Sequence, residues 1–339
     1  MAVTIRDVAK AAGTSISTVS KVINRHYSIS EATAERVRQV MEEMNYHPMA
    51  SAQSFASGMT RKVAFLAALQ RDVAFDNPHM FEMLCGLEEA LQKRGYAVML
   101  RSTDTTAVSA LAEEVIARRE CDALAIHASV LSRPLAALLS RTRFPHVVLG
   151  QPGFACQVSW IDINNVYCGV LASEHLVSLG RRRVAFLGGG EHDLISVHRL
   201  EGVRQGLREA DLPLEERYIW LGESTRDEGA RMADQLLGLR PLPDAIICAN
   251  NVLALGCVAA VQRRGLRIPH DIAIMTFDDH PFSALCDPPL SVVDIDVREM
   301  GVQAGKFLLS AIKKPNLQSQ THTATPNLIV RASTVEGQG

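Results

Sequence analysis

Arg199, Asn250 and Asp278 stand at or near the carboxyl ends of apolar runs that are typical of buried strands. In open parallel sheets, ligands bind beyond the carboxyl ends of the strands. A guanidinium, an amide and a carboxylate together supply donors and acceptors in fixed directions, which a polyhydroxylated ligand requires. We therefore expect these side chains to line a small-molecule site, although each alone is equally typical of a solvated helix start or a capped loop.

The stretch from Ser15 to Arg25 offers a second kind of chemistry. Its small hydroxyls can approach phosphates and base edges, and its cations can bind phosphate or guanine. On a helix, the exposed side would carry Ile16, Ser17, Thr18, Ser20, Lys21 and Arg25. This pattern indicates contact with nucleic acid, but the same spacing also occurs in ordinary αα-hairpins.

Enzyme and metal motifs are missing from the sequence. "FLGGGEHD" has neither G-x-G-x-x-G spacing nor a G-K-[ST] ending, which favours a tight turn over a phosphate loop. His192 and His198 do not form H-E-x-x-H, the run Asp278 to His280 lacks partners at ligand spacing, and no G-x-S-x-G elbow occurs. We predict no enzyme activity, no metal and no cofactor other than a small-molecule effector.

Charge and composition narrow the class of protein. A net charge of −2 over 339 residues argues against a chain that coats nucleic acid along its whole length. Residues 1–29 nevertheless hide a basic surface, where Arg6, Lys10, Lys21 and Arg25 face only Asp7. There is no uncharged apolar run of about 18 residues that could span a bilayer, and the seven cysteines form no C-x-x-C pair. We expect a cytoplasmic protein.

Helical periodicity predicts a small all-α domain over residues 1–46. The first helix would begin in a capping box of Thr4 and Asp7 and stop at Gly13. Ser15 can cap the second helix, and the third would follow Ser30 and end near Tyr46. The inward positions would be Ile5, Val8, Ala9, Ala12, Val19, Val22, Ile23, Val37, Val40, Met41 and Met44.

From Val63 onward, aliphatic strands alternate with helices, which predicts parallel sheets covered on both faces. The predicted strands lie in "KVAFLAAL", "YAVMLRS", "CDALAIHA", "FPHVVLG", "RRVAFLGGG", "YIWLGES", "PDAIICAN" and "IAIMTFDD". The units before and after about Asp162 are alike in length and order, so we expect two similar lobes. Residues 47–62 between the two regions fit either a flexible linker or a short helix that something else orders.

The residue identities in the first 48 positions are more specific evidence than their helical periodicity. "TIRDVAKAAGTSISTVSKVINRHYSISEATAERVRQVMEEMNYHP" resembles the DNA-binding headpiece of the LacI/GalR family of bacterial repressors. The resemblance continues in "NPHMFEMLCGLEEALQKRGY", in Arg199 and Gly202 of "VHRLEGV", and in "ICANNVLALG", "MTFDDHP" and "PPLSVVDIDVREMG". It covers nearly the whole chain.

The resemblance implies an all-α helix-turn-helix headpiece and an α/β two-lobed core with parallel sheets, similar to type I periplasmic binding proteins. The implied divisions are a headpiece at 1–46, a hinge at 47–62 and a core at 63–339, with lobes of about 63–161 plus 293–319 and 162–292 plus 320–335. A homodimer would bind a near-palindromic operator, with no membrane involved. No leucine heptads follow the core, which favours a dimer over a tetramer.

The resemblance also assigns roles to residues. DNA contacts would come from Thr4, Ser15, Ile16, Ser17, Thr18, Ser20, Lys21, Asn24, Ser28, Ser30 and Thr33. The hinge would enter the minor groove through Ala52, Gln53 and Phe55. The effector would meet Arg199, Asn250, Asp278, His127, Phe81 and Ser224.

The sequence departs from the family pattern at several of these positions. Phe55 stands where a leucine usually wedges into the minor groove, although aromatic wedges can also kink a base step. Lys21 replaces an arginine, which exchanges a planar fork for a point charge. Thr14 stands where valine is common, with a hydroxyl that we expect to bond a nearby carbonyl. Around the expected ligand, four positions differ from the usual family residues: Gly150, Gln151, Ser224 and Asn251. His127 fits either of two roles, a contact to the ligand, for example to an anionic group, or a core histidine bonded to the backbone.

These observations predict a ligand-responsive transcriptional repressor, of carbohydrate or sugar-acid genes, in which an inducer bound between the lobes releases the operator. It would be nucleoid-associated when bound to DNA. The alternatives are a family member that uses a corepressor or a protein partner, a sugar-binding protein without DNA function, and a sugar-modifying enzyme.

Overall fold

The computed structural model describes residues 3–23, 28–46, 58–69, 78–190, 192–322 and 325–336. The predicted DNA contact of Asn24 and the predicted hinge residues Ala52, Gln53 and Phe55 lie outside these ranges. By contacts between Cα atoms, the chain divides into two compact units, residues 1–68, 91–146 and 308–317, and residues 69–90, 147–307 and 318–339. Among the described residues, no helix combines the length and the apolar character needed to cross a membrane.

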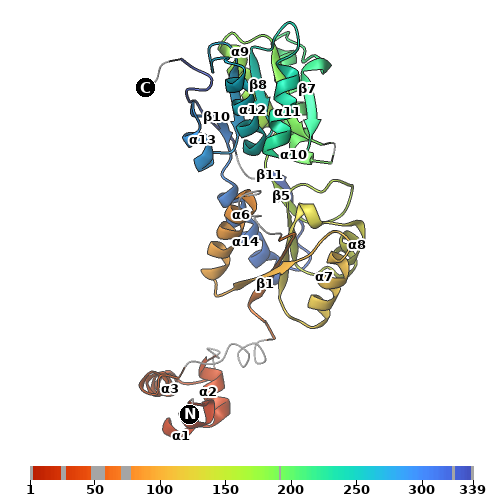
Figure 1. The fold of residues 1–339 in the computed structure, drawn as a ribbon. Helices are drawn as coiled ribbons and strands as arrows, with labels where there is room; N and C mark the ends of the chain where they lie inside the picture. Colours follow the sequence, from red (N-terminus) through yellow and green to blue (C-terminus); the bar gives the residue numbers. More distant parts are fainter. Residues whose placement is uncertain are drawn as a thin grey trace. The chain divides into compact units, whose positions relative to one another are not determined.

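The N-terminal part of the first unit is a group of short helices, α1 (Ile5–Ala11), α2 (Ile16–Ile23) and α3 (Glu31–Glu43) (Figure 1). The backbone N and the hydroxyl of Thr4 donate to Asp7 Oδ2 at 2.9 and 2.7 Å, which fixes the start of α1. Gly13 ends the turn with a φ of 61°, in the left-handed region that favours glycine. Ser15 Oγ accepts from Thr18 N at 3.1 Å and caps α2.

These helices share one small core. Val8, Val19 and Val37, one from each helix, are fully buried. The cluster also includes Ala9, Ala12, Val22 and Ala34, with Ile5, Ile23, Ile29, Val40, Met41, Met44 and Tyr46 packed against it. The predicted helices and their inward faces are therefore confirmed.

Thr14 corrects one expectation about this domain. Its hydroxyl oxygen is buried and has no hydrogen-bond partner among the described residues, whereas a bond to a nearby carbonyl was expected. The side chain keeps the shape of valine, but the oxygen loses its water without compensation. A buried hydroxyl in this state costs free energy of folding.

The rest of the described chain is built on parallel sheets. The first has the strand order β11-β5-β4-β3-β1-β2, with β1 (Lys62–Ala67) parallel to both β2 (Ala97–Ser102) and β3 (Ala123–His127). Its other strands are β4 (His146–Leu149), β5 (Trp160–Asp162) and β11 (Gln320–His322). The helices that follow its strands in the chain are α6 (Pro78–Gln92), α7 (Val108–Ala117) and α8 (Arg133–Thr142).

The second sheet belongs wholly to the second unit and has the order β12-β10-β9-β8-β6-β7. Its strands are β6 (Val184–Gly189), β7 (Ile219–Gly222), β8 (Ala245–Cys248), β9 (Ala273–Phe277), β10 (Ser291–Asp294) and β12 (Asn327–Ile329), the last antiparallel to β10. Its helices are α9 (Asn165–Ser178), α10 (Leu194–Glu209), α11 (Arg226–Leu236), α12 (Asn251–Arg263) and α13 (Pro281–Leu285), and α14 spans Val297–Lys313.

Both faces of this second sheet are covered. Alternate strand residues, such as Leu187, Ile246 and Ile274, join a core with side chains of α11 and α12. The strand residues between them are also buried, and Phe277 lies beneath Arg199 of α10. Because neither face of the inner strands β6, β8 and β9 meets water, these strands are continuous aliphatic runs, as the sequence pattern predicted, whereas the edge strands β7 and β12 are partly exposed.

The two sheets share one local interaction, an aspartate that accepts hydrogen bonds from the backbone just before a strand. Asp122, just before β3, accepts hydrogen bonds from the backbone N of Thr60 and Arg61 at 2.9 and 2.8 Å. Asp244, just before β8, accepts from the backbone N of Arg182 and Arg183 at 3.0 and 2.9 Å. In each sheet an aspartate thus fixes the chain just before a strand, β1 in the first sheet and β6 in the second, which supports the expected likeness of the two halves.

The late strands refine the predicted division of the chain. Gln320–His322 pair with β5 in the first sheet, although residues from about 320 onward were expected in the second lobe. Val293 and Asp294 belong to β10 in the second sheet, although residues from 293 onward were placed in the first lobe. These strands are only three or four residues long, so the sequence pattern alone did not reveal them.

In the second unit, pairs of helices pack closely because glycines lie where they cross. A Cβ atom at Gly202 of α10 would overlap the carbonyl of Val166 on α9, and one at Gly169 of α9 would overlap the carbonyl of Arg199. Glycines play the same part where α11 meets α12, at Gly229 and Gly256. The close crossing of α9 and α10 sets the depth at which the α10 side chains enter the protein.

We expect Thr14→Val to stabilise the N-terminal helices by about 1 kcal/mol, because it removes the unpaired buried oxygen and keeps the shape. Hydrogen exchange of the α1 and α2 amides in the full chain would measure the change as slower exchange. Thr33→Val is the control, since the Thr33 hydroxyl does have a partner, Ser30 Oγ at 2.9 Å. Faster exchange in Thr14→Val would show that the oxygen is bonded in solution.

Gly202→Ala should lower the free energy of unfolding by about 1–3 kcal/mol, because the added methyl forces α9 and α10 apart. Urea unfolding of the full chain would measure the loss. Gly190→Ala is the matched control, since a Cβ there would meet no atom nearer than 3.8 Å. Equal stability of the two variants would mean that the helix crossing is not close.

Candidate functional site

Arg199 is the centre of a buried polar cluster, with only 3% of its surface exposed. Its Nε donates to Asn165 Oδ1 at 3.1 Å, and Nη1 donates to the carbonyl of Ala249 at 2.6 Å. The guanidinium carbon lies 4.2 Å from the centre of the Phe277 ring. Nη1 and Nη2 both lie 3.2 Å from Asp278 Oδ2. Most of the donors of this arginine are therefore used inside the protein.

Asp278 is held in place by its backbone. It follows β9 with a φ of 70°, and its N donates to the carbonyl of Val293 at 2.9 Å. Asn251 Nδ2 donates to the carbonyls of Phe277 and Asp278, both at 3.0 Å, and Ser283 Oγ donates to Asn251 Oδ1 at 2.7 Å. Asn251, noted in the sequence only as a departure from the family pattern, thus fixes the loop that carries the carboxylate.

His79 of α6 contacts the same carboxylate, with Nε2 3.1 Å from Asp278 Oδ2. Its ring lies edge-on to His280, with centroids 5.4 Å apart. Burial alone would raise the pKa of Asp278, but the charges and hydrogen bonds of Arg199 and His79 hold it well below its usual range. Sequence reasoning missed His79, because no spacing rule connects residues 79 and 278.

Asn250 and Ser224 form the neighbouring part of the site. Asn250 caps α12, where its Oδ1 accepts from Leu253 N at 2.9 Å, and its Nδ2 donates to Ser224 Oγ at 3.0 Å. Ala249, whose carbonyl binds Arg199, immediately precedes it. The structure therefore brings four predicted residues into one region: Arg199, Asp278, Asn250 and Ser224.

The other two predicted effector residues are placed differently. His127 lies in the first unit, and its Nδ1 is 3.3 Å from the backbone N of Ser129, from which it accepts. Burial lowers the pKa of His127 to about 4, so the imidazole is neutral at pH 7 and offers no charge to an anion. Phe81 lies on α6 two residues after His79, and 57% of its surface is exposed. Among the residues that the structure describes, no hydrogen bond links His127 or Phe81 to the Arg199 cluster.

The predicted DNA-contacting residues lie on the outer side of the N-terminal helices. On α2, Ser17 and Lys21 are exposed and Ile16 is 45% exposed, opposite the buried Val19 and Val22. The remaining described positions on this side are Thr4, Ser15, Thr18, Ser20, Ser28, Ser30 and Thr33. Three of them, Thr18, Ser20 and Thr33, are half-buried. Three others, Thr4, Ser15 and Ser30, cap or begin helices. This surface combines an apolar side chain, hydroxyls and a cation.

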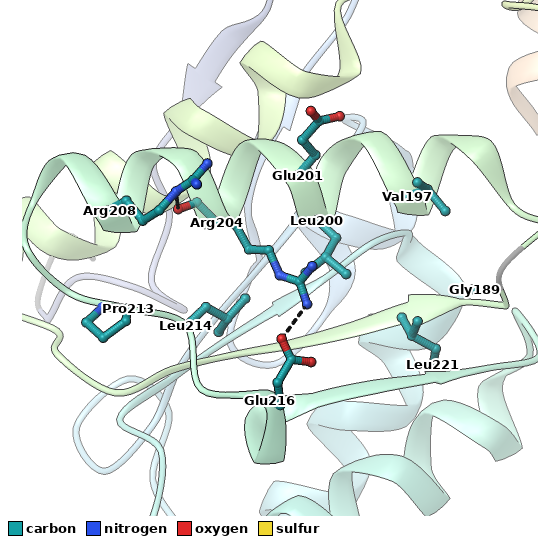
Figure 2. Close-up of a pocket in the computed structure, with 10 residues that line it drawn as sticks. All are labelled: Gly189, Val197, Leu200, Glu201, Arg204, Arg208, Pro213, Leu214, Glu216 and Leu221. Atoms are coloured by element: carbon teal, nitrogen blue, oxygen red, sulfur yellow. Dashed lines mark hydrogen bonds and ion pairs between the residues drawn. The ribbon is translucent and has the colours of Figure 1, made fainter.

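A separate hollow of about 630 Å³ lies between α10 and β7 (Figure 2). Val197, Leu200, Leu214 and Leu221 give it apolar walls, and the ion pair of Arg204 and Glu216, at 2.7 Å, crosses it. None of the predicted effector residues lines this hollow. Its central polar groups satisfy one another, so it is not the predicted site. Among the described residues, no group of three or more His, Cys, Asp or Glu could hold a metal ion.

Comparison with known families matches two parts of the chain. Residues 4–49 match the model of bacterial regulatory proteins of the lacI family, and residues 173–334 match a periplasmic binding protein-like domain. The HTH-type transcriptional repressor PurR of Aliivibrio salmonicida is 30% identical over 97% of this chain and 98% of its own length. PurR of Vibrio atlanticus is 29% identical, with the same coverage.

Solved structures agree with these matches. A complex of the transcriptional regulator CelR with cellobiose is 28% identical with a TM-score of 0.74, covering 98% of this chain and 99% of its own. The Lac repressor bound to ONPG in the repressed state is 25% identical with a TM-score of 0.80, covering 98% and 100%. These relatives are regulators of transcription, and the curated ones are repressors rather than enzymes. The chain therefore belongs to the lacI family of bacterial regulatory proteins and is a transcriptional repressor of that family.

Proposed function

We propose that residues 1–46 bind a near-palindromic operator with α2 in the major groove. The observation that carries this proposal is the α2 surface, where Ile16, Ser17 and Lys21 are exposed while the opposite side is locked into the core. An α-helix that offers hydroxyls and a cation suits base edges and phosphates together. Residues 47–62 are the proposed hinge, with Phe55 as its minor-groove wedge.

The proposed effector site comprises the ends of β8 and β9 and the first turn of α12, in the core at 63–339. An exposed hydroxyl from Ser224 and the amide of Asn250 lie beside a buried guanidinium and carboxylate. Such a set recognises a polar ring with several hydroxyls, so we favour a sugar or sugar derivative. CelR was solved with cellobiose, which supports a sugar as the ligand class. The name PurR, which other relatives carry, gives no support to a sugar.

The response to the ligand follows from linkage. An effector changes operator affinity only if it binds the two arrangements of the lobes with different affinity, and the coupling is reciprocal. We propose an inducer, which releases the operator. A corepressor is the second candidate, and titration of the ligand into the protein–operator complex separates the two by sign.

The proposed assembly is a homodimer, which a two-fold operator requires. Its support is an exposed apolar surface on α13, where Leu285 is 81% exposed and Phe282 is 44% exposed. Exposed apolar side chains that lie next to each other are typical of surfaces that a partner covers. Because its target is chromosomal DNA, the repressor would work in the bacterial cytoplasm, on the nucleoid when bound.

Lys21→Ala should weaken operator binding by about 1–3 kcal/mol and relax the preference at one base pair. Binding to a set of operators with single base-pair changes would measure both effects. Arg38→Ala is the control, because Arg38 is on α3 and already paired with Glu31 and Glu35. An equal loss on every sequence would restrict Lys21 to phosphate contact.

Thermal unfolding against sugars, sugar phosphates, sugar acids and nucleobases should reveal the effector. A ligand at about 100 times its Kd stabilises the native state by roughly 2.7 kcal/mol. Ser224→Ala should reduce this shift, whereas Ser178→Ala, whose hydroxyl bonds the His175 carbonyl, should retain it. Asp278→Ala is a poor choice, because an unpaired buried arginine costs about 3–5 kcal/mol by itself. A shift that is identical in Ser224→Ala and the wild type would place the ligand elsewhere.

A further inference from the structure

His79 covers the side of the Asp278 carboxylate that Arg199 leaves open. The side chain of Asp278 is 5% exposed, whereas that of His79 is 27% exposed and contacts Oδ2 at 3.1 Å. Arg199, on the other side of the carboxylate, is as buried as Asp278. The imidazole is therefore the more accessible of the two partners of this carboxylate.

The difference between these partners is chemical as well as geometric. Arg199 is tied to Asn165 and to the carbonyl of Ala249 in addition to Asp278. His79 has a polar contact with Asp278 and an edge contact with the His280 ring. An arriving ligand can displace a side chain with one polar contact far more easily than a guanidinium that is bound on several sides.

We propose that His79 is an internal competitor of the effector at Asp278, and that a ligand N–H or O–H group replaces its imidazolium and releases its proton. This inference rests on the proposed effector site. It assigns His79 as a specificity-determining residue, and it gives the ligand class as one that presents a hydrogen-bond donor, rather than an anion, to the carboxylate.

The charges around His79 set the direction of the proton movement. Burial and Arg199 oppose the imidazolium form of His79, whereas Asp278 and Glu82 of α6 favour it. Burial and the charge of His79 lower the pKa of the neighbouring His280. Burial alone would lower the pKa of His79, but the charge and hydrogen bond of Asp278 outweigh it and raise that pKa above 6.5. Asp279 forms an ion pair with Arg331.

The sign of the pH dependence follows. In the ligand-free protein, Asp278 raises the pKa of His79, and a ligand that takes Asp278 removes this cause. Binding therefore releases a proton, and affinity rises as the pH rises through the interval between the bound and free pKa values. Each pKa unit between them changes Kd by up to about tenfold. An anionic ligand that pairs with the imidazolium would instead take up a proton and bind more tightly at low pH.

Calorimetry of the full chain tests this proposal with cellobiose, gluconate and guanine as probes. Titrations in phosphate and in Tris at about pH 7 give the number of protons exchanged, and a pH series gives Kd. We expect proton release and a Kd that falls as pH rises for the wild type. His79→Gln, which keeps an N–H donor without a charge, should bind with no proton release and a flat pH profile.

His270→Gln is the matched control, because His270 pairs with Asp271 at 3.0 Å in the same unit, away from the Arg199 cluster. It should keep the proton release of the wild type. Binding without proton release in the wild type, or with proton uptake, overturns the competitor role and leaves the effector site intact. If no probe binds, the proposed sugar effector fails, and this inference fails with it.

Discussion

The buried ion pair of Arg199 and Asp278 is the constraint on which the second unit depends. A guanidinium with 3% of its surface exposed costs several kcal/mol in desolvation unless charge and hydrogen bonds replace its water. Asn165 of α9, the carbonyl of Ala249 after β8 and the carboxylate after β9 provide them. The pair thus ties together α9, α10 and the ends of two neighbouring strands. The same requirement that keeps the charge satisfied holds the proposed ligand-binding residues at fixed positions.

Glycine is what allows α9 and α10 to meet this requirement. Arg199 lies on the side of α10 whose backbone touches α9. A side chain at Gly169 would collide with the α10 backbone, and one at Gly202 would collide with the α9 backbone. Without the close crossing, Arg199 Nε could not reach Asn165 at 3.1 Å. The packing of two helices therefore decides the geometry of a polar site that lies at their ends.

The N-terminal helices solve a different physical problem from the core. They bury a small set of aliphatic side chains and leave hydroxyls and cations outside, so a chain with a net charge of −2 still carries a local basic surface. Asp122 fixes the backbone of Thr60 and Arg61, which lie at the end of the proposed hinge, just before β1. Asp244 does the same for β6. The two halves are therefore alike in using an aspartate carboxylate at the same point, just before a strand of the sheet.

The sequence by itself determined the helices of residues 1–46, the alternation of strands and helices after Val63, and the family. Local spacing sufficed there, because capping residues, helical periodicity and aliphatic runs each act within about ten residues. It also placed Asn250 and Asp278 just after strands, where the structure has them, whereas Arg199, expected near a strand end, lies inside α10. Their contact with a ligand stays a proposal. Only the tertiary structure decided that Asp278 binds His79, that Asn251 holds the Asp278 loop, and that the Thr14 hydroxyl has no partner within the described part of the chain. Contacts between residues 200 positions apart depend on helix crossing and strand register, which no local pattern encodes.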